Sequence, residues 1–259
     1  MTDHLDLDAY LDRVGYRGPR RASIDTLQAL HLAHATSIPF ENLDILLGRG
    51  IRLDLESLQR KLVAGRRGGY CFEQNLLFEA ALAALGFEVT LLSARVRYGV
   101  TVVRPRTHML LLVTFEDGQW IADVGFGGEG LLLPVALAVD IESSQFRWTY
   151  RIVIDGRHYV LQSRRSDGWI DMYAFTLEPH EHVDYEVANH FTSTYPTSPF
   201  RAMPIAQRPS PEARYILRDR ELTTDTGESV GTRTIADDEL LDVLSETFGI
   251  DLPAGTKLR

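Results

Sequence analysis

The sequence predicts an α+β fold in which a helical part, a part built of strands and a mixed part follow one another. Residues 5–87 carry apolar side chains at helical spacing, with capping residues in front of several stretches. Residues 88–177 change to the two-residue alternation of β-strands, interrupted by turn sequences. The remaining residues mix the two patterns. Two changes of pattern along the chain therefore indicate three successive structural parts.

Four stretches of the first part are predicted to be helices: Asp8 to Val14, Ile24 to Thr36, Leu55 to Val63 and Phe72 to Leu85. Ser23 and Asp54 stand directly before the second and third stretches, where a short polar side chain caps free backbone N–H groups. Gly65 and Gly86 follow the third and fourth, as glycine commonly does where a helix ends.

The middle and last parts are predicted to contain hairpins, short strands and two further helices. One hairpin has the strands Phe146 to Ile154 and Arg157 to Arg164, joined at the turn dipeptide Asp155-Gly156, and a further strand runs from Trp169 to Thr176. In the last part we expect a helix near Glu181 to Thr192, a proline-rich stretch over 195–204, two short strands around Gly227, and a final helix near Asp238 to Phe248.

Cys71 is the only cysteine, so it can form neither an internal disulfide nor a multi-thiolate zinc site. It lies in the run Arg-Gly-Gly-Tyr-Cys-Phe-Glu-Gln-Asn, directly before a predicted helix. Free N–H groups and the helix dipole at such a position favour a thiolate. The alternative is that Cys71 is a packing residue, since free cysteine is among the most buried residue types.

A thiol nucleophile needs a base and a group that orients the base, and His108 and Asp123 are the candidates. They lie at the same open end of a second predicted hairpin, and the length of its loop decides whether they meet. A two-residue turn at 117–118 would leave them roughly 13 Å apart. A four-residue loop over 115–118 pairs Asp123 with Leu110 and makes His108 its diagonal neighbour, roughly 7–8 Å away. We predict the longer loop, because a charged aspartate within an apolar strand needs a partner.

Four segments in this order resemble the signatures of the arylamine N-acetyltransferases: Ile38 to Leu43 (IPFENL), Arg67 to Asn75 (RGGYCFEQN), Thr107-His108, and Asp123 to Gly127 (DVGFG). The resemblance covers essentially the whole chain and becomes thin beyond about residue 198. It implies a catalytic triad of Cys71, His108 and Asp123, with acetyl-coenzyme A as acetyl donor. It also implies a helical bundle over residues 1–87, an antiparallel β-barrel over 88–178 and an α/β lid over 179–259.

The resemblance further suggests substrate contacts, each with a structural alternative. Three phenylalanines are candidate walls for a flat acceptor ring, with core packing the alternative: Phe40, Phe126 and Phe200. Three glycines after Asp123 are candidates for bringing backbone N–H groups to the coenzyme A phosphates, with turn formation the alternative: Gly125, Gly127 and Gly128. Glu41 and Arg67 are expected to form an ion pair behind the nucleophile.

The amino-acid composition limits the classes of molecule that we expect the protein to bind. The net charge of −9 disfavours nucleic acid and anionic membranes as partners, and no apolar run approaches the roughly 20 residues of a membrane span. The acidic first residues predict no signal peptide, and a single unpaired cysteine suits the reducing cytoplasm. His180 and His182 lie near His190, but their spacing is not that of a metal motif, so no metal is expected. The expected partners are an arylamine or hydrazine and acetyl-CoA, in a monomer or homodimer.

Two other enzyme functions fit a cysteine, histidine and aspartate triad. A macrolactam-forming amide synthase, related to the same family, would accept an acyl chain from a carrier protein. A papain-like hydrolase would pass the acyl group to water, but the Cys-Gly-Ser-Cys-Trp sequence of such enzymes is absent. We therefore predict an arylamine N-acetyltransferase that works through acetyl-Cys71, with hydrazines and N-hydroxyarylamines as further acceptors.

Overall fold

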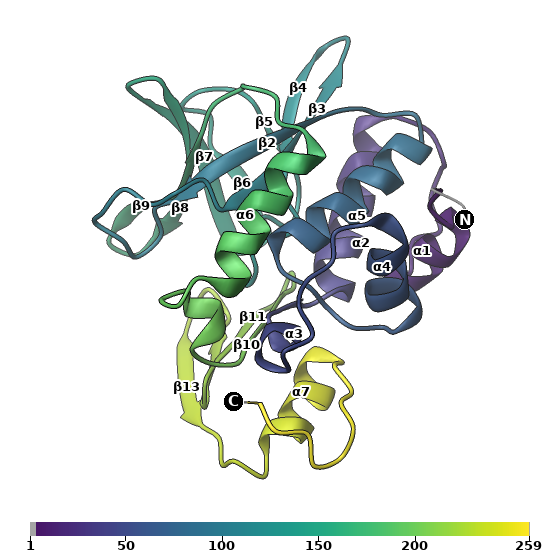
Figure 1. Cartoon of the computed structure of the whole chain (residues 1–259). Coiled ribbons are helices and arrows are strands. Elements are labelled where there is room, and N and C mark those ends of the chain that lie inside the picture. The colour runs from purple at the N-terminus through teal and green to yellow at the C-terminus, as the bar shows by residue number, and fades with distance from the viewer. Residues whose placement is uncertain (1–3, 259) are drawn as a thin grey trace.

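The computed structural model describes residues 4–258, and it places a layer of helices beside a curled sheet and a second, smaller sheet (Figure 1). The first three residues of the acidic N-terminal segment and the last residue of the chain lie outside the described part. The predicted α+β fold class is confirmed. Among residues 4–258, no helix has the length and apolar character needed to cross a membrane.

The helical layer contains five α-helices and one π-helical segment: α1 (Leu7–Val14), α2 (Ile24–Ser37), α3 (Leu43–Leu46), α4 (Leu55–Leu58), η1 (Gln59–Ala64) and α5 (Cys71–Ala84). Both predicted caps are confirmed. Ser23 Oγ accepts from the N–H of Thr26 at 3.3 Å, and Asp54 Oδ1 accepts from the N–H of Ser57 at 2.9 Å. The helix predicted over 55–63 differs, because after one α-helical turn it widens into η1.

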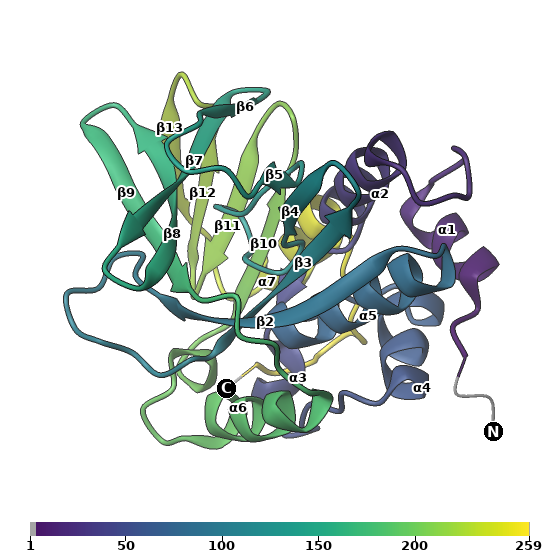
Figure 2. The same ribbon diagram turned by 90° about the horizontal axis from the view of Figure 1, so that it is seen from above.

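Eight antiparallel strands form the curled sheet, which is a nearly closed barrel (Figure 2). The strands are β2 (Glu88–Val96), β3 (His108–Phe115), β4 (Gly118–Ala122), β5 (Val135–Ala136), β6 (Ser143–Gln145), β7 (Trp148–Asp155), β8 (His158–Arg165) and β9 (Gly168–Phe175). Their order is β5-β4-β3-β2-β9-β8-β7-β6. Buried apolar side chains from most of these strands form one cluster inside the barrel.

The hairpin of β3 and β4 has the predicted register but a shorter loop. Leu111 pairs with Ala122, which places Asp123 opposite Leu110, as expected. The predicted loop of four residues is wrong, because Phe115 and Gly118 form the last pair and only two residues connect the strands. The turn between β7 and β8 also differs by one residue. It consists of 156–157, and Gly156 takes the positive φ of +59° that such tight turns require.

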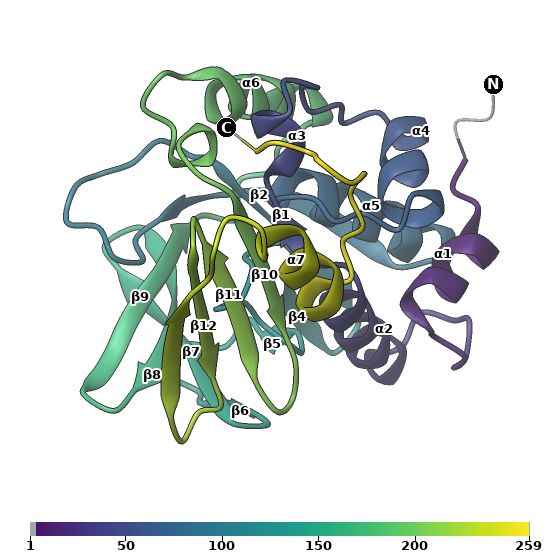
Figure 3. The ribbon, with the colours of Figure 1, turned by 90° about the horizontal axis from the view of Figure 1, so that it is seen from below.

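The smaller sheet joins distant parts of the chain, with the order β1-β10-β11-β12-β13. Its strands are β1 (Phe40–Glu41), β10 (Ile205–Pro209), β11 (Arg214–Arg218), β12 (Glu221–Asp225) and β13 (Val230–Thr234). Helix α7 (Leu240–Phe248) packs on one face of this sheet (Figure 3). Helix α6 (His182–Thr194) and the short 3₁₀ helix η2 (Pro199–Arg201) precede β10 in the chain. The sequence predicted β12, β13, α6 and α7 but not β10 or β11.

Helix α5 packs against the barrel, and this contact positions the candidate site. Apolar side chains of α5, β3 and the segment after β4 share the main core: Cys71, Leu76, Met109, Leu111 and Val124. The start of α5 therefore lies beside the ends of β3 and β4 where His108 and Asp123 stand.

Candidate active site

Cys71 stands at the N-terminus of α5, as predicted, although the helix begins at Cys71 itself and not at Phe72. The carboxylate of Glu73 accepts a hydrogen bond from the N–H of Tyr70 at 3.1 Å, and the carbonyl of Tyr70 accepts from the N–H of Gln74 at 3.0 Å. These contacts fix the first turn. The thiol is 4% exposed and lies 3.7 Å from the carbonyl oxygen of Thr107, the residue before His108. The side chain therefore points from the helix terminus toward the start of β3.

His108 and Asp123 meet as predicted. His108 Nε2 lies 2.7 Å from Asp123 Oδ2, and both side chains are buried. Since Asp123 occupies Nε2, Nδ1 is the ring nitrogen left for Cys71. Burial by itself would lower the pKa of His108, but the charge and hydrogen bond of Asp123, together with Cys71, raise it to about 10. The site therefore favours an imidazolium.

Asp123 remains ionised because its other contacts are donors. Burial by itself would raise its pKa, but the charge of His108 and three hydrogen bonds lower it. Oδ1 accepts from the side-chain amide of Asn75 at 3.0 Å and from the N–H of Gly125 at 2.9 Å. The N–H of Asp123 donates to Nε2 of His31 at 3.1 Å. Burial lowers the pKa of His31 to about 4, so His31 is neutral and can accept this bond.

Three side chains that lie beside His108 or Asp123 were not predicted from the sequence to be part of the site: His31, Asn75 and Tyr173. Asn75 also donates to the carbonyl of Met109 at 2.8 Å and accepts from the N–H of Val124, so it links α5 to β3 and to the segment that follows β4. A signal for Asn75 was present, because it stands four residues after Cys71 and so lies on the same face of the helix. His31 and Tyr173 come from α2 and β9, far away in sequence.

Aromatic rings lie against His108 and against Tyr70, the residue before Cys71, and they include two of the predicted phenylalanines directly and the third through a ring neighbour. Phe126 packs edge-on against the imidazole of His108, with ring centroids 5.2 Å apart, and Tyr173 lies 4.9 Å from the same imidazole. The ring of Phe200 lies with its centroid 6.0 Å from that of Phe40 and 5.8 Å from that of Tyr70. Phe40 is buried, whereas Phe126 and Phe200 are half-buried.

The predicted glycines make close backbone contacts. A Cβ atom on Gly125 would lie 2.8 Å from Cys71 Cα, so a larger residue could not approach the start of α5. The N–H of Gly128 donates to Gln207 Oε1 at 2.8 Å, while Gly127 has a φ of +95° and lies against the same glutamine. The N–H groups of Gly125 and Gly128 therefore already have acceptors within the protein.

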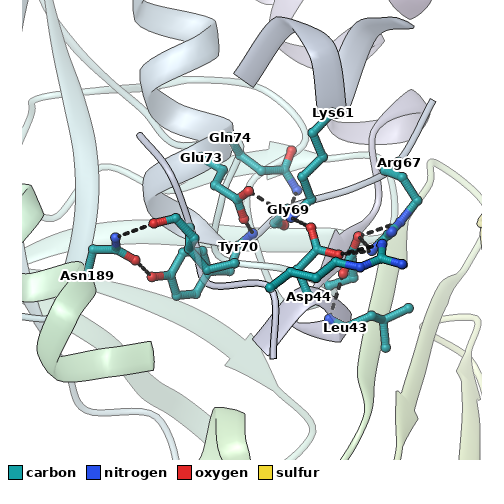
Figure 4. Close-up of polar contacts among 12 residues, drawn as sticks. Leu43, Asp44, Lys61, Arg67, Gly69, Tyr70, Glu73, Gln74 and Asn189 are labelled. Carbon is teal, nitrogen blue, oxygen red and sulfur yellow. Dashed lines mark hydrogen bonds and ion pairs between the residues drawn. The ribbon is translucent and has the colours of Figure 1, made fainter. Parts of the chain in front are cut away.

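The predicted ion pair of Glu41 and Arg67 is confirmed, with Arg67 Nη2 lying 2.6 Å from Glu41 Oε1. It belongs to a larger charged network behind Cys71, part of which Figure 4 shows. No group of three histidine, cysteine or acidic side chains within the described residues could hold a metal ion.

Comparisons with known proteins identify the family of the chain. A family model for N-acetyltransferases matches residues 23–257. An arylamine N-acetyltransferase of Escherichia coli is 42% identical over 248 residues, covering 94% of this chain and 88% of that protein. The Nocardia farcinica arylamine N-acetyltransferase has a TM-score of 0.92 at 44% identity, covering 96% of this chain and 90% of its own. The Mycobacterium marinum enzyme in complex with CoA has a TM-score of 0.90 at 36% identity, covering 95% and 93%. The chain belongs to the arylamine N-acetyltransferase family.

Proposed function

We propose that the protein transfers an acetyl group from acetyl-CoA to arylamines through an acetyl-Cys71 intermediate. The observation that carries the proposal is the thiol at the first residue of α5, beside an imidazole that is hydrogen-bonded to a buried carboxylate at 2.7 Å. The solved relative with bound CoA supports the choice of donor. Hydrazines and N-hydroxyarylamines are further acceptors under this proposal.

In the first half-reaction, His108 holds the proton of Cys71, and the thiolate attacks the thioester carbonyl. The carbon–sulfur bond to CoA then breaks, and the departing CoA sulfur takes the proton from His108. Asp123 holds the imidazole with Nε2 as the donor and stabilises its charge. The backbone N–H of Cys71, at the helix start, is our candidate donor to the oxyanion. Gly125 is unsuited to that role because its N–H already donates to Asp123.

In the second half-reaction, an amine nitrogen attacks the acetyl-cysteine carbonyl. Its proton passes to His108, and Cys71 leaves as thiolate. An arylamine is unprotonated at pH 7 and can attack directly, whereas an alkylamine such as lysine is almost wholly protonated. We propose that the flat ring is held by Phe126, which packs against His108, together with Phe40 and Phe200, which pack against each other.

The three glycines after Asp123 are proposed to shape the coenzyme A side of the site. Since the N–H groups of Gly125 and Gly128 have acceptors within the protein, their contribution is close backbone approach rather than donation to phosphate. Gly127, with its positive φ, remains our candidate for direct contact with the donor.

Intact mass spectrometry tests the central step. After incubation with acetyl-CoA, the wild-type mass should rise by one acetyl group, and the Cys71→Ser variant should show no rise. An acetyl adduct that persists in the serine variant would refute the assignment. The release of CoA should require an arylamine. Release without amine would instead indicate a hydrolase, and acylation only from a carrier protein would indicate an amide synthase.

We also propose that residues 1–87, 88–178 and 179–259 are three domains, with β1 supplied by the first to the sheet of the third. Limited proteolysis should cut first near the two boundaries, and early cuts within β2 to β9 would contradict the division. We place the enzyme in the cytoplasm as a monomer or homodimer, which cell fractionation and sedimentation would decide.

A further inference from the structure

Five charged side chains form a network behind the start of α5, hereafter the charged network: Glu41, Asp44, Lys61, Arg67 and Glu73. We propose that Lys61 is a positioning residue for the thiol of Cys71, because it holds the carboxylate of Glu73 in an ion pair and so removes an uncompensated negative charge from the first turn of α5. The inference rests on the proposed function, in which Cys71 reacts as a thiolate.

The contacts of Glu73 place its charge in the first turn of the helix. One carboxylate oxygen accepts the N–H of Tyr70 at 3.1 Å, and the other lies 2.7 Å from Nζ of Lys61 (Figure 4). Lys61 Nζ also lies 3.0 Å from Asp44 Oδ2. The side chain of Glu73 is only 2% exposed, so water screens its charge poorly.

The charged network leaves Glu73 dependent on Lys61 alone. The network contains three carboxylates and two largely buried cations, and Asp44 also lies 3.5 Å from the exposed Arg49. Arg67 forms ion pairs with the other two carboxylates: its Nη2 lies 2.6 Å from Glu41 Oε1 and 3.3 Å from Asp44 Oδ1. Within residues 4–258, Lys61 is the one cation at ion-pair distance from Glu73. Burial already raises the pKa of Glu73 against the lowering effect of the Lys61 charge, and removal of Lys61 would raise that pKa further. Above that pKa, a buried carboxylate would face the start of α5 without compensation.

That carboxylate would oppose the chemistry proposed for Cys71. A helix N-terminus stabilises a thiolate, but a second negative charge in the same turn disfavours it. The other titratable or charged groups around the thiol act from different elements: His108 and Asp123 from the barrel, Tyr70 before the helix and Tyr185 from α6. None of these groups contacts Glu73 as a cation. Lys61 itself stands in η1, and π-helical segments of this kind are common at functional sites.

The rate at which iodoacetamide alkylates Cys71, measured against pH, reports the thiolate without acetyl-CoA. In Lys61→Met we expect the midpoint of this profile to rise by about one pH unit, the size expected for one uncompensated charge in the same helical turn. Lys61→Arg should keep the wild-type midpoint, and the double variant Lys61→Met with Glu73→Gln should return close to it. Arg60→Met, an exposed neighbour in η1, is the matched control and should change nothing.

A structural role for Lys61 predicts a different result. If Lys61→Met lowers the melting temperature but keeps the wild-type midpoint, the proposal is overturned, and it is also overturned if the double variant keeps the raised midpoint. If Lys61→Met does not fold, Glu73→Gln alone decides, because removal of the carboxylate should lower the midpoint and an unchanged midpoint refutes the idea. The alkylation profile is independent of acetyl transfer, so failure of the proposed function would appear separately, in the mass experiment.

Discussion

Replacement of Asp123 by asparagine should leave the fold intact and remove most of the activity. Asp123 receives three donors: the imidazole of His108 at 2.7 Å, the amide of Asn75 at 3.0 Å and the N–H of Gly125 at 2.9 Å. Asparagine has nearly the same shape but only one oxygen. Asn75 and Gly125 both bind Oδ1, so the asparagine oxygen is best placed there. Its NH₂ group then faces His108.

An NH₂ group at that position forces Nε2 of His108 to accept a hydrogen bond. The imidazole proton must then lie on Nδ1, the nitrogen that we assign to Cys71, so the ring can no longer take the thiol proton. The pKa of His108, held at about 10 largely by the carboxylate, would also fall. The same exchange in serine-protease triads costs about 10⁴-fold in turnover, and we expect a loss of about that size here.

The assay is a single-turnover acetylation with acetyl-CoA, accompanied by thermal unfolding. The expected result is an acetylation rate about 10⁴-fold lower with a melting temperature near that of the wild type. Asp117→Asn, at the exposed turn of the same hairpin, is the matched control and should keep full activity. A rate within tenfold of wild type for Asp123→Asn would mean that the carboxylate is structural and that the tautomer argument is wrong.

Three further predictions test the aromatic site, the packing of the smaller sheet and the buried histidines. Phe126→Ala or Phe40→Ala should slow arylamine turnover more than acetylation of Cys71, since stacking contributes about 1 kcal/mol for each ring; equal losses in both half-reactions would contradict this. Arg214 is fully buried and lies 2.9 Å from Glu129, but Arg165 also pairs with that carboxylate. Arg214→Met should therefore lower the free energy of unfolding by about 1–3 kcal/mol, measured in urea, because Glu129 and the hydroxyl of Tyr150 each lose a donor; a loss below about 0.5 kcal/mol would refute it. Burial lowers the pKa values of His31 and His34 to about 4 and about 3, so the unfolded chain binds two protons that the native chain does not. Urea unfolding should therefore show stability falling by roughly 2.7 kcal/mol per pH unit from about pH 6 to 4.5, and a flat profile would oppose it.

Local patterns were sufficient for much of the fold and for the central residues of the site. The caps at Ser23 and Asp54 act within one turn, so the sequence alone carries their signal. The register that brings His108 to Asp123 was also predicted correctly, from the need of a charged aspartate within an apolar strand for a partner. The loop length was wrong because the sequence does not show which of the residues at the turn form the last pair.

The missed features depend on contacts between distant parts of the chain. Strand β10 pairs with β1, joining Phe40 to Gln207, and the proline-rich sequence before it gave no alternating pattern. His31 and Tyr173 reach the site from α2 and β9, and only the closed fold brings these elements together. The charged network also depends on contacts that the sequence does not show, since Lys61 and Glu73 are twelve residues apart in the chain. Lys61 lies in a π-helical segment, and the sequence gives no evident signal for its wider turn.

The burial of the site and its aromatic lining address the same chemical problem. An acetyl-cysteine must survive until an amine arrives, so water has to be excluded from a carbonyl that a neutral nitrogen can still reach. Cys71, His108 and Asp123 are each less than 5% exposed, and the rings of Phe126 and Tyr173 pack directly on the imidazole. A flat aromatic amine can replace these ring contacts with contacts to its own apolar face, whereas a water molecule has no apolar face. Under the proposed function, the packing that protects the acetyl-enzyme from hydrolysis is therefore also what selects an aromatic acceptor.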